Sequence, residues 1–246
     1  MQNQMTTNKI VLIGIQARST STRFPGKIFE LVGNKRVLEH VIDKAKSARD
    51  YLQRFVKHIN IQCHIVVLHP YGDRKIKETF QHTNVTFMEG DEQDVLSRYI
   101  KAAKTLNADY TVRITSDCPL ILDFVINKHI RCAIFNELDY VSNIEEECRQ
   151  VADGLDCECL SKRAMDWLEV HAVKDFDREH VTTLIRSERP PELLQGFISS
   201  KQDTTNLKLS LDTPEDLQVI RAYYHQREHK NEVARKIFGP RYIYEL

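Results

Sequence analysis

The sequence has no excess of either charge, because 35 Lys and Arg residues balance 35 Asp and Glu residues in a chain of 246. A neutral chain lacks the broad basic surface of a protein that coats nucleic acid or an anionic membrane, although it allows a local basic pocket. We therefore expect neither nucleic acid nor a membrane among its partners. A small molecule held in such a pocket is the alternative that this balance favours.

Long apolar runs and cysteine frameworks are also missing. No apolar stretch approaches the roughly 20 residues with which a helix crosses a bilayer. The N-terminal MQNQMTTNK has no basic segment followed by the apolar segment of a signal peptide. The six cysteines include no CxxC pair, so the spacing favours reduced thiols over a zinc site or a disulfide framework. Together these features predict a cytoplasmic protein.

What the chain does have is a regular alternation of strand and helix patterns. Short apolar runs predict strands at residues 10–15, 61–68, 84–88, 110–114, 139–142, 156–160, 193–198 and 207–211. Apolar residues at helical spacing predict helices at residues 35–47, 92–106, 124–135, 161–174 and 178–187. A last helix is expected after Asp212, with Thr213 as its N-cap and Pro214 as its first residue.

This alternation predicts a three-layer α/β/α fold of the Rossmann-like kind, in which helices cover both faces of a mostly parallel sheet. We expect residues 1–8 to form a flexible tail and residues 9–246 to form one domain, with residues 49–60 as an extension of the first crossover. In such a sheet, ligands bind beyond the carboxyl ends of the strands. The loops that follow the strands are therefore where a site is expected.

The loop after the first predicted strand, GIQARSTSTRFPGKIF, concentrates charge and hydroxyl groups. It is not a P-loop, because Gly26-Lys27 is followed by Ile28 and position 21 is serine, and it is not a GxGxxG fingerprint either. Either it is a solvated turn, or its cations and backbone amides hold a group with several negative charges such as a triphosphate.

Two aspartates shift the balance toward a triphosphate. Asp117 and Asp212 each follow an apolar strand, in TSDCPL and in SLDTPEDL. Carboxylates at one edge of a sheet, facing a polyphosphate loop, suit Mg²⁺, which takes one or two carboxylates with phosphate oxygens and water. Each aspartate alone has an ordinary explanation, since Asp before a turn or at a helix start is common. In combination they predict a magnesium site.

Seven segments in order resemble the SpsF family of cytidylyltransferase-like proteins, which are related to the CMP-Kdo and CMP-acylneuraminate synthetases. These segments are IQARSTSTRFPGK, GDEQDVLSRY, ADYTVRITSDCPLI, DYVSN, DGLDCE, REHVTTLIR and LSLDTPEDL. They span roughly residues 10 to 220. The resemblance implies a nucleotidyltransferase, typically a homodimer, that joins CMP from CTP to an acidic sugar or phosphorylated metabolite for surface polysaccharide synthesis and releases pyrophosphate.

The resemblance also implies roles for individual residues. The catalytic residues would be Arg18, Lys27, Asp117 and Asp212, of which the two aspartates would bind Mg²⁺. The nucleotide would contact Gln16, Ala17, Arg18, Ser19, Ser21, Arg23, Lys27, Gly90, Asp91, Asp94, Thr115 and Asp117. The acceptor would contact Asp153, Asp156, Glu158, Arg178, Glu179 and His180.

Two other functions remain open at this stage. One is a glycosyltransferase that uses a sugar nucleotide, although the usual Asp-x-Asp metal motif is not evident after the fourth strand, where the chain reads Ser116-Asp117-Cys118. The other is a catalytically silent nucleotide-binding protein. The acceptor is open as well, because an acid sugar would give a CMP-linked product and a phosphorylated acceptor a CDP-linked one.

Overall fold

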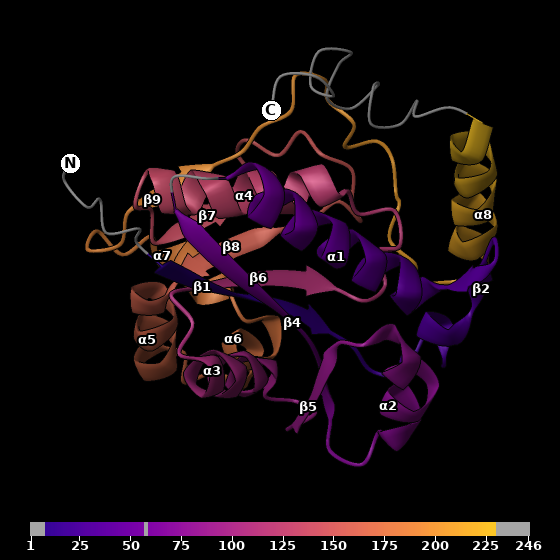
Figure 1. Ribbon diagram of the computed structural model, residues 1–246, viewed down its shortest axis with the longest axis horizontal. Helices are drawn as coiled ribbons and strands as arrows, with labels where there is room; N and C mark the ends of the chain where they lie inside the picture. The colour runs from indigo at the N-terminus through magenta and orange to yellow at the C-terminus, as the bar shows by residue number, and fades with distance from the viewer. Residues whose placement is uncertain (1–7, 57–58, 230–246) are drawn as a thin grey trace.

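The computed structural model describes residues 8–56 and 59–229, and Figure 1 shows a twisted sheet with helices above and below it. The sheet has the order β5-β4-β1-β6-β8-β7-β9. Its strands are β1 (Asn8–Gln16), β4 (Asn60–Pro70), β5 (Thr86–Gly90), β6 (Tyr110–Thr115), β7 (Tyr140–Ser142), β8 (Glu158–Ser161) and β9 (Gln195–Phe197). Only β8 is antiparallel to its neighbours in this sheet. The predicted three-layer fold with a mostly parallel sheet is confirmed.

The helices divide between two buried clusters, one on each face of the sheet. The first cluster contains side chains of α1 (Val37–Phe55), α2 (Arg74–Phe80), α4 (Asp123–Phe135) and α8 (Pro214–His229). The second contains side chains of α3 (Val95–Leu106), α5 (Lys162–His171) and α7 (Thr183–Glu188). Neighbours in β1 alternate between them, with Val11 in the first and Leu12 in the second. Because both faces are covered, the strand is apolar at consecutive positions.

Smaller elements complete the described chain. A two-stranded antiparallel pair, β2 (Leu31–Val32) and β3 (Lys35–Arg36), leads into α1. Two 3-10 turns lie at Lys27–Phe29 and Gln81–Thr83, and α6 (Asp175–His180) precedes α7. Among the helices of the described ranges, none combines the length and the apolar character that a membrane span needs.

Several predicted elements need correction. The single helix expected over residues 178–187 is two helices, because Val181 takes a φ of 65° that interrupts the helical backbone. The strand expected over residues 207–211 is reduced to an isolated bridge between Asp153 and Lys208. The helix α2 was not predicted. Of the expected tail, residues 1–7 lie outside the described residues and Asn8 already belongs to β1.

The register of the parallel strands places the site. Gln16, the last residue of β1, is paired with Leu68 of β4 on one side and with Thr115 of β6 on the other. The loops that follow these strands therefore leave the sheet at the same edge. Asp212 reaches that edge too, because the backbone N–H of Leu211 donates to the Asp117 carbonyl at 2.8 Å. This edge is where ligands bind in open parallel sheets.

Candidate active site

The loop between Gln16 and Lys27 folds back on itself. Gly26 has a φ of 74°, a left-handed conformation that glycine adopts without strain, and its N–H donates to the Ser19 carbonyl at 2.9 Å. The Ser19 N–H is in turn tied to Asp73 Oδ2 at 2.8 Å, and Thr20 Oγ1 to Glu92 Oε1 at 2.7 Å. These bonds fix the loop at both ends. The turn at Gly26 directs the Lys27 side chain inward.

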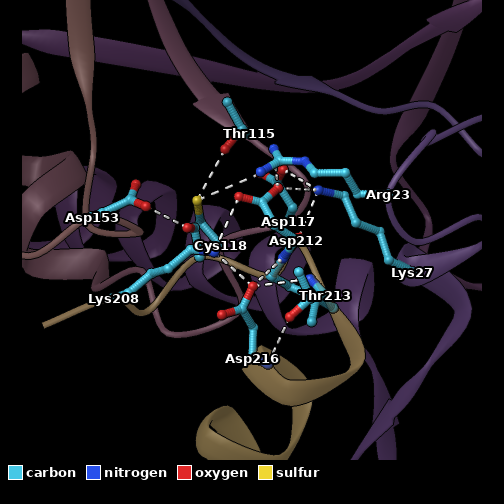
Figure 2. A network of polar contacts seen from close by, with 12 residues as sticks. Arg23, Lys27, Thr115, Asp117, Cys118, Asp153, Lys208, Asp212, Thr213 and Asp216 are labelled. Carbon is cyan, nitrogen blue, oxygen red and sulfur yellow. Dashed lines mark hydrogen bonds and ion pairs between the residues drawn. The ribbon is translucent and has the colours of Figure 1, made fainter.

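Lys27 forms the centre of a charged group that we call the rim cluster, made of Lys27, Asp117 and Asp212. Its Nζ lies 2.7 Å from Asp117 Oδ2, 3.1 Å from Asp212 Oδ1 and 2.6 Å from the Leu211 carbonyl oxygen. Lys27 is buried, whereas the side chains of Asp117 and Asp212 are 27% and 17% exposed. Figure 2 shows the Lys27 side chain reaching Asp117 and Asp212. The predicted partners, about 90 and 185 residues from Lys27 in sequence, meet here.

Further charged residues hold Asp212. Arg23 Nη2 lies 2.9 Å from Asp212 Oδ1, and Lys208 Nζ lies 3.4 Å from Asp212 Oδ2. Asp216 Oδ2 accepts hydrogen bonds from the backbone N–H groups of Asp212 and Thr213, both at 2.9 Å, and pairs with Lys208 at 2.7 Å. The Asp216 N–H donates to Thr213 Oγ1 at 3.3 Å, so Thr213 caps α8 as expected. The DTPED sequence thus builds a turn that presents Asp212 to Lys27, as Figure 2 shows.

The electrostatics keep Asp117 ionised. Burial by itself would raise the pKa of this carboxyl, but the charge of the Lys27 ammonium and its hydrogen bond outweigh burial, so the pKa lies below its usual value. An ionised carboxylate beside a buried ammonium can exchange this contact for others, because a second cation can bind the carboxylate and an anion can bind the ammonium. The rim cluster therefore has the properties of a binding site for a metal with a polyphosphate.

A cavity of about 210 Å³ opens beside the rim cluster. Most predicted nucleotide contacts line it, as do the predicted metal ligand Asp212 and two predicted acceptor contacts. The lining residues among those predicted are Gln16, Ala17, Arg18, Ser21, Arg23, Lys27, Thr115, Asp117, Asp212, Glu179 and His180. The cavity is also lined by residues that the sequence analysis did not select, namely Thr22, Glu92, Val95, Arg98, Arg113 and Ser116. The signal that could have found Arg98 and Arg113 is their charge, since each interrupts an apolar segment at a position that must be buried.

Arg98 is a buried cation at the α3 side of the cavity. It is 3% exposed, and its guanidinium donates to the Leu68 carbonyl at 3.2 Å and the Glu92 carbonyl at 3.5 Å. Its Nε has no hydrogen-bond partner among the described residues. Burial lowers the pKa of this guanidinium, and the Arg18 charge adds to the effect. Gly90 is required beside it, because a Cβ there would lie 2.4 Å from Arg98 Cγ.

Glu158, expected to contact the acceptor, is buried beneath the cavity instead. Its Oε2 lies 2.5 Å from Arg113 Nη1, and its Oε1 accepts the Tyr140 hydroxyl at 2.5 Å. Burial opposes its ionisation, but the Arg113 charge prevails and holds the pKa of Glu158 below its usual value. We call Arg113 and Glu158 the floor pair. Glu158 reaches the cavity through Arg113 and not by its own atoms.

Asp153 and Asp156 also lie outside the lining of the cavity. Asp153 Oδ2 accepts the Ser210 hydroxyl at 2.5 Å, and Asp156 pairs with Arg149 at 2.6 Å. Burial raises the pKa of Asp156 to about 6, and the nearby Asp153 and Glu158 carboxylates add to this against the pull of Arg149. Asp156 precedes β8, which begins at Glu158, so the two do not share a strand as predicted.

The residues at the turn into α3 that were predicted to contact the nucleotide make structural hydrogen bonds instead. Asp91 Oδ1 accepts the N–H groups of Gln93 and Asp94, both at 2.8 Å, and these bonds lower the pKa of Asp91. Asp94 caps α3 by accepting the Ser97 N–H at 2.9 Å, and it pairs with Arg178 Nε at 2.7 Å. Asp94 and Arg178, assigned to nucleotide and acceptor respectively, are thus bound to each other. None of Gly90, Asp91, Asp94 and Arg178 belongs to the lining of the cavity.

Glu179 and His180 reach the cavity from the end of α6, just before a strained turn. Val181 combines a φ of 65° with a ψ of −58°, and the Thr182 N–H donates to the His180 carbonyl at 2.7 Å, which is the geometry of a γ-turn. A β-branched residue with positive φ costs of the order of 1–3 kcal/mol, and such strain concentrates at functional sites. The turn ends α6 at the point where His180 enters the cavity.

The rim cluster suits a divalent metal in one respect and limits it in another. Oxygens of Asp117 and Asp212 already converge on one positive charge, the Lys27 ammonium. Across residues 8–56 and 59–229, no group of three or more His, Cys, Asp or Glu residues could hold a metal ion. Two carboxylates are nevertheless what Mg²⁺ takes when phosphate oxygens and water complete its shell. The residues therefore fit a metal that arrives with a polyphosphate ligand.

This fold and this site define a nucleotidyltransferase, a class that positions a nucleoside triphosphate at the carboxyl edge of a parallel sheet. A family model described as cytidylyltransferase matches residues 11–237. The chain therefore belongs to the cytidylyltransferase family, and its donor substrate is CTP, from which a CMP group is transferred.

Individual relatives agree with this membership. The chain is 24% identical over 230 residues to the spore coat polysaccharide biosynthesis protein SpsF of Bacillus subtilis, with 91% of this chain and 90% of SpsF covered. A cytidylyltransferase structure from Leptospira borgpetersenii is similar with a TM-score of 0.75 and 26% identity, covering 94% of each chain. A CMP:2-keto-3-deoxy-manno-octonic acid synthetase complexed with CTP shares the fold, with a TM-score of 0.62, 14% identity, and 90% and 99% of the two chains covered. The resemblance to SpsF-like cytidylyltransferases is confirmed.

Proposed function

We propose that the protein transfers CMP from CTP to an acidic sugar with release of pyrophosphate, with Mg²⁺ as the metal, in the synthesis of a surface polysaccharide or glycoconjugate. The observation that carries the proposal is the rim cluster, where a lysine and two aspartates from three distant segments meet beside a loop with two further cations. The name of the Bacillus relative supports the polysaccharide role, and that of the CTP-bound synthetase supports the acidic sugar.

The reaction asks for positioning and charge neutralisation more than for covalent help from the protein. An acceptor oxygen attacks the α-phosphorus of CTP, the bond from that phosphorus to the bridging oxygen breaks, and pyrophosphate leaves. Arg18, Arg23 and Lys27 would neutralise the leaving pyrophosphate from the loop. Asp117 and Asp212 would hold Mg²⁺, which when bound withdraws charge from the phosphate oxygens.

Glu179 and His180 are the predicted acceptor residues that line the cavity, and we assign them contact with the acceptor hydroxyls. They come from the end of α6. Arg113, also in the lining, is neutralised by Glu158 and so does not act as a free cation for an acidic group. We further propose that the protein is a cytoplasmic homodimer, with residues 9–246 as one domain.

Pyrophosphate release on mixing protein, CTP, Mg²⁺ and a panel of acceptors tests the proposal. Acid sugars should give release and a CMP-linked product, while sugar phosphates should not. Release only with a phosphorylated acceptor would keep the cytidylyltransferase and overturn the acidic sugar. A sugar nucleotide that is consumed with release of its nucleotide would favour the glycosyltransferase instead. Sedimentation or light scattering measures the oligomeric state.

A further inference from the structure

Gln16 has a fixed orientation that the catalytic proposal does not explain. It ends β1 and lines the cavity next to Ala17, and its Oε1 lies 3.1 Å from Arg113 Nε. A guanidinium has donors and no acceptor, so the oxygen of the amide must face Arg113. The amide nitrogen is therefore turned away from Arg113 and left to donate within the cavity.

The residues below Gln16 prevent the amide from turning over. Arg113 is held by Glu158 at 2.5 Å, and Glu158 is held in turn by the Tyr140 hydroxyl at 2.5 Å. Glu158 is 1% exposed, so its bonds to Arg113 and Tyr140 are shielded from water, whereas Arg113 and Gln16 reach the cavity. Reversing the Gln16 amide would place two donors against each other and would cost the hydrogen bond to Arg113. The Gln16 side chain is thus held with its amide nitrogen free to donate a hydrogen bond in the cavity.

The lining of the cavity that Gln16 shares has a small apolar part. Ala17 and Val95 are the aliphatic residues of its lining, and the other lining residues are polar or charged. A pyrimidine ring packs against aliphatic surface, whereas the triphosphate belongs with Lys27 and the two aspartates. Ala17 follows Gln16 directly in the chain. A base that contacts Ala17 and Val95 is within reach of the Gln16 amide.

We propose that the Gln16 amide, oriented by Arg113 and Glu158, donates to the N3 acceptor of cytosine and so selects CTP over UTP. Uracil carries a hydrogen at N3, so two donors would then oppose each other. Sites that hydrogen-bond one edge of a base reject analogues that leave a buried polar group unpaired. Arg113 and Glu158 are positioning residues in this scheme. The proposal rests on the proposed function and adds to it the group that recognises the base.

The decisive variant is Gln16→Glu, which keeps the shape of the side chain and an oxygen for Arg113 but offers an acceptor to the cavity. Thermal shifts are measured with CTP, UTP and pyrophosphate. We expect CTP binding to weaken about ten- to a hundredfold and UTP binding to strengthen relative to CTP. Pyrophosphate binding should stay unchanged. Gln16→Met removes the donor, so it should weaken CTP binding, leave UTP binding no weaker, and abolish the discrimination between the two nucleotides.

Two controls separate reading of the base from general damage. Gln195→Glu makes the same chemical change on β9, at the far edge of the sheet, and should leave the CTP to UTP ratio unchanged. Arg113→Lys keeps a charge for Glu158 but lacks the planar fork that joins Glu158 to Gln16. It should therefore reduce the CTP to UTP ratio while pyrophosphate binding and the fold persist.

The proposal is overturned if Gln16→Glu and Gln16→Met both keep the wild-type ratio of CTP to UTP affinity. It is also overturned if pyrophosphate binding falls as far as CTP binding, because Gln16 would then contact phosphate. Failure of the proposed function looks different, since the wild-type protein would then show no preference for CTP and release no pyrophosphate. A wild-type protein that prefers CTP and a Gln16→Glu variant that does so equally would overturn the reading by Gln16 alone.

Discussion

The rim cluster and the floor pair are both ion pairs of Lys or Arg with carboxylates, yet they have opposite exposure. In the rim cluster the carboxylates of Asp117 and Asp212 remain 27% and 17% exposed, and the cation between them is shared. In the floor pair Glu158 is 1% exposed and each of its oxygens already has a partner. The first can exchange its partners for a ligand, and the second cannot. On this comparison we propose that the rim cluster carries the chemistry and that the floor pair contributes orientation and stability.

The largest effect is expected at the rim cluster. Asp117→Asn removes the charge that neutralises Lys27 and that would hold the metal, so pyrophosphate release should fall at least about a hundredfold while the fold persists. Circular dichroism and turnover with CTP and Mg²⁺ measure the two. Asp43→Asn, which breaks the exposed pair with Lys35, is the matched control and should retain full turnover. Near-native turnover of Asp117→Asn would remove the rim cluster from the chemistry.

Loss of the floor pair should lower the stability of the protein more than its turnover. Glu158→Gln leaves the Arg113 guanidinium buried without its counter-charge, and breaking a buried ion pair from one side costs about 3–5 kcal/mol. Urea denaturation should show this loss, with turnover at low temperature reduced less than in Asp117→Asn. A Glu158→Gln protein with native stability and no turnover would mean that Glu158 acts on the substrate directly, as the sequence analysis had it.

The third prediction concerns Asp156, a carboxylate near the floor pair whose ionised form is destabilised by burial. Folded Asp156 keeps its proton up to about pH 6, whereas an ordinary Asp releases it near 3.8. The folded state therefore binds more protons between these values, and this group's stabilising contribution is lost as the pH rises through that window. Asp156→Asn has no such loss. Relative to wild type it should gain up to about 2 kcal/mol in unfolding free energy between pH 4 and pH 7.

Denaturant unfolding of Asp156→Asn and of wild type at four pH values measures this difference. A constant difference between Asp156→Asn and wild type across the range would show that the Arg149 pair fully offsets burial.

The contrast between the two regions also explains what the sequence could predict. Asp117 was found because it follows an apolar strand, and parallel strands end at one edge. Asp212 was found from an apolar run that forms only an isolated bridge, and the hydrogen bond from the Leu211 N–H to the Asp117 carbonyl brings it to the same edge.

Glu158 was assigned to the acceptor by the family resemblance, within a strand predicted over residues 156–160. Because β8 is antiparallel, Glu158 instead begins its strand beside the end of β6. Strand direction depends on long-range pairing, which local periodicity does not record. Val181 was missed for a similar reason, since its residue type favours a helix or a strand over a positive φ.

Arg113 shows a second reason why part of the site could not be predicted from the sequence. Its charge within the apolar TVRIT segment marks a buried position, but only the register of β6 against β1 and β8 gives it Gln16 and Glu158 as partners. The identity of such partners follows from the tertiary fold. Helix caps, by contrast, are local, and Thr213 and Pro214 were predicted correctly because their signals lie within four residues of the helix start.

The smallest effect is expected at Lys208, which we compare with Lys35, a lysine of similar exposure that has different neighbours. Lys208 and Lys35 are 43% and 46% exposed and each is paired with a carboxylate, so Lys208→Met and Lys35→Met should each change the unfolding free energy by less than about 1 kcal/mol. Lys208 also lies 3.4 Å from Asp212, which Lys35 does not approach. Residues that orient a metal ligand change metal affinity by about 10–100-fold, and an exposed one belongs at the low end.

Lys208→Met should therefore raise the Mg²⁺ concentration for half-maximal pyrophosphate release by about tenfold or less, and Lys35→Met should not. Titration of Mg²⁺ at saturating CTP measures this. Equal responses of the two lysine variants would mean that Asp212 is held by Asp216 and the backbone alone. Lys208 would then have no effect on the rim cluster, and its contacts with Asp212 and Asp216 would be ordinary surface ion pairs that stabilise the protein only weakly.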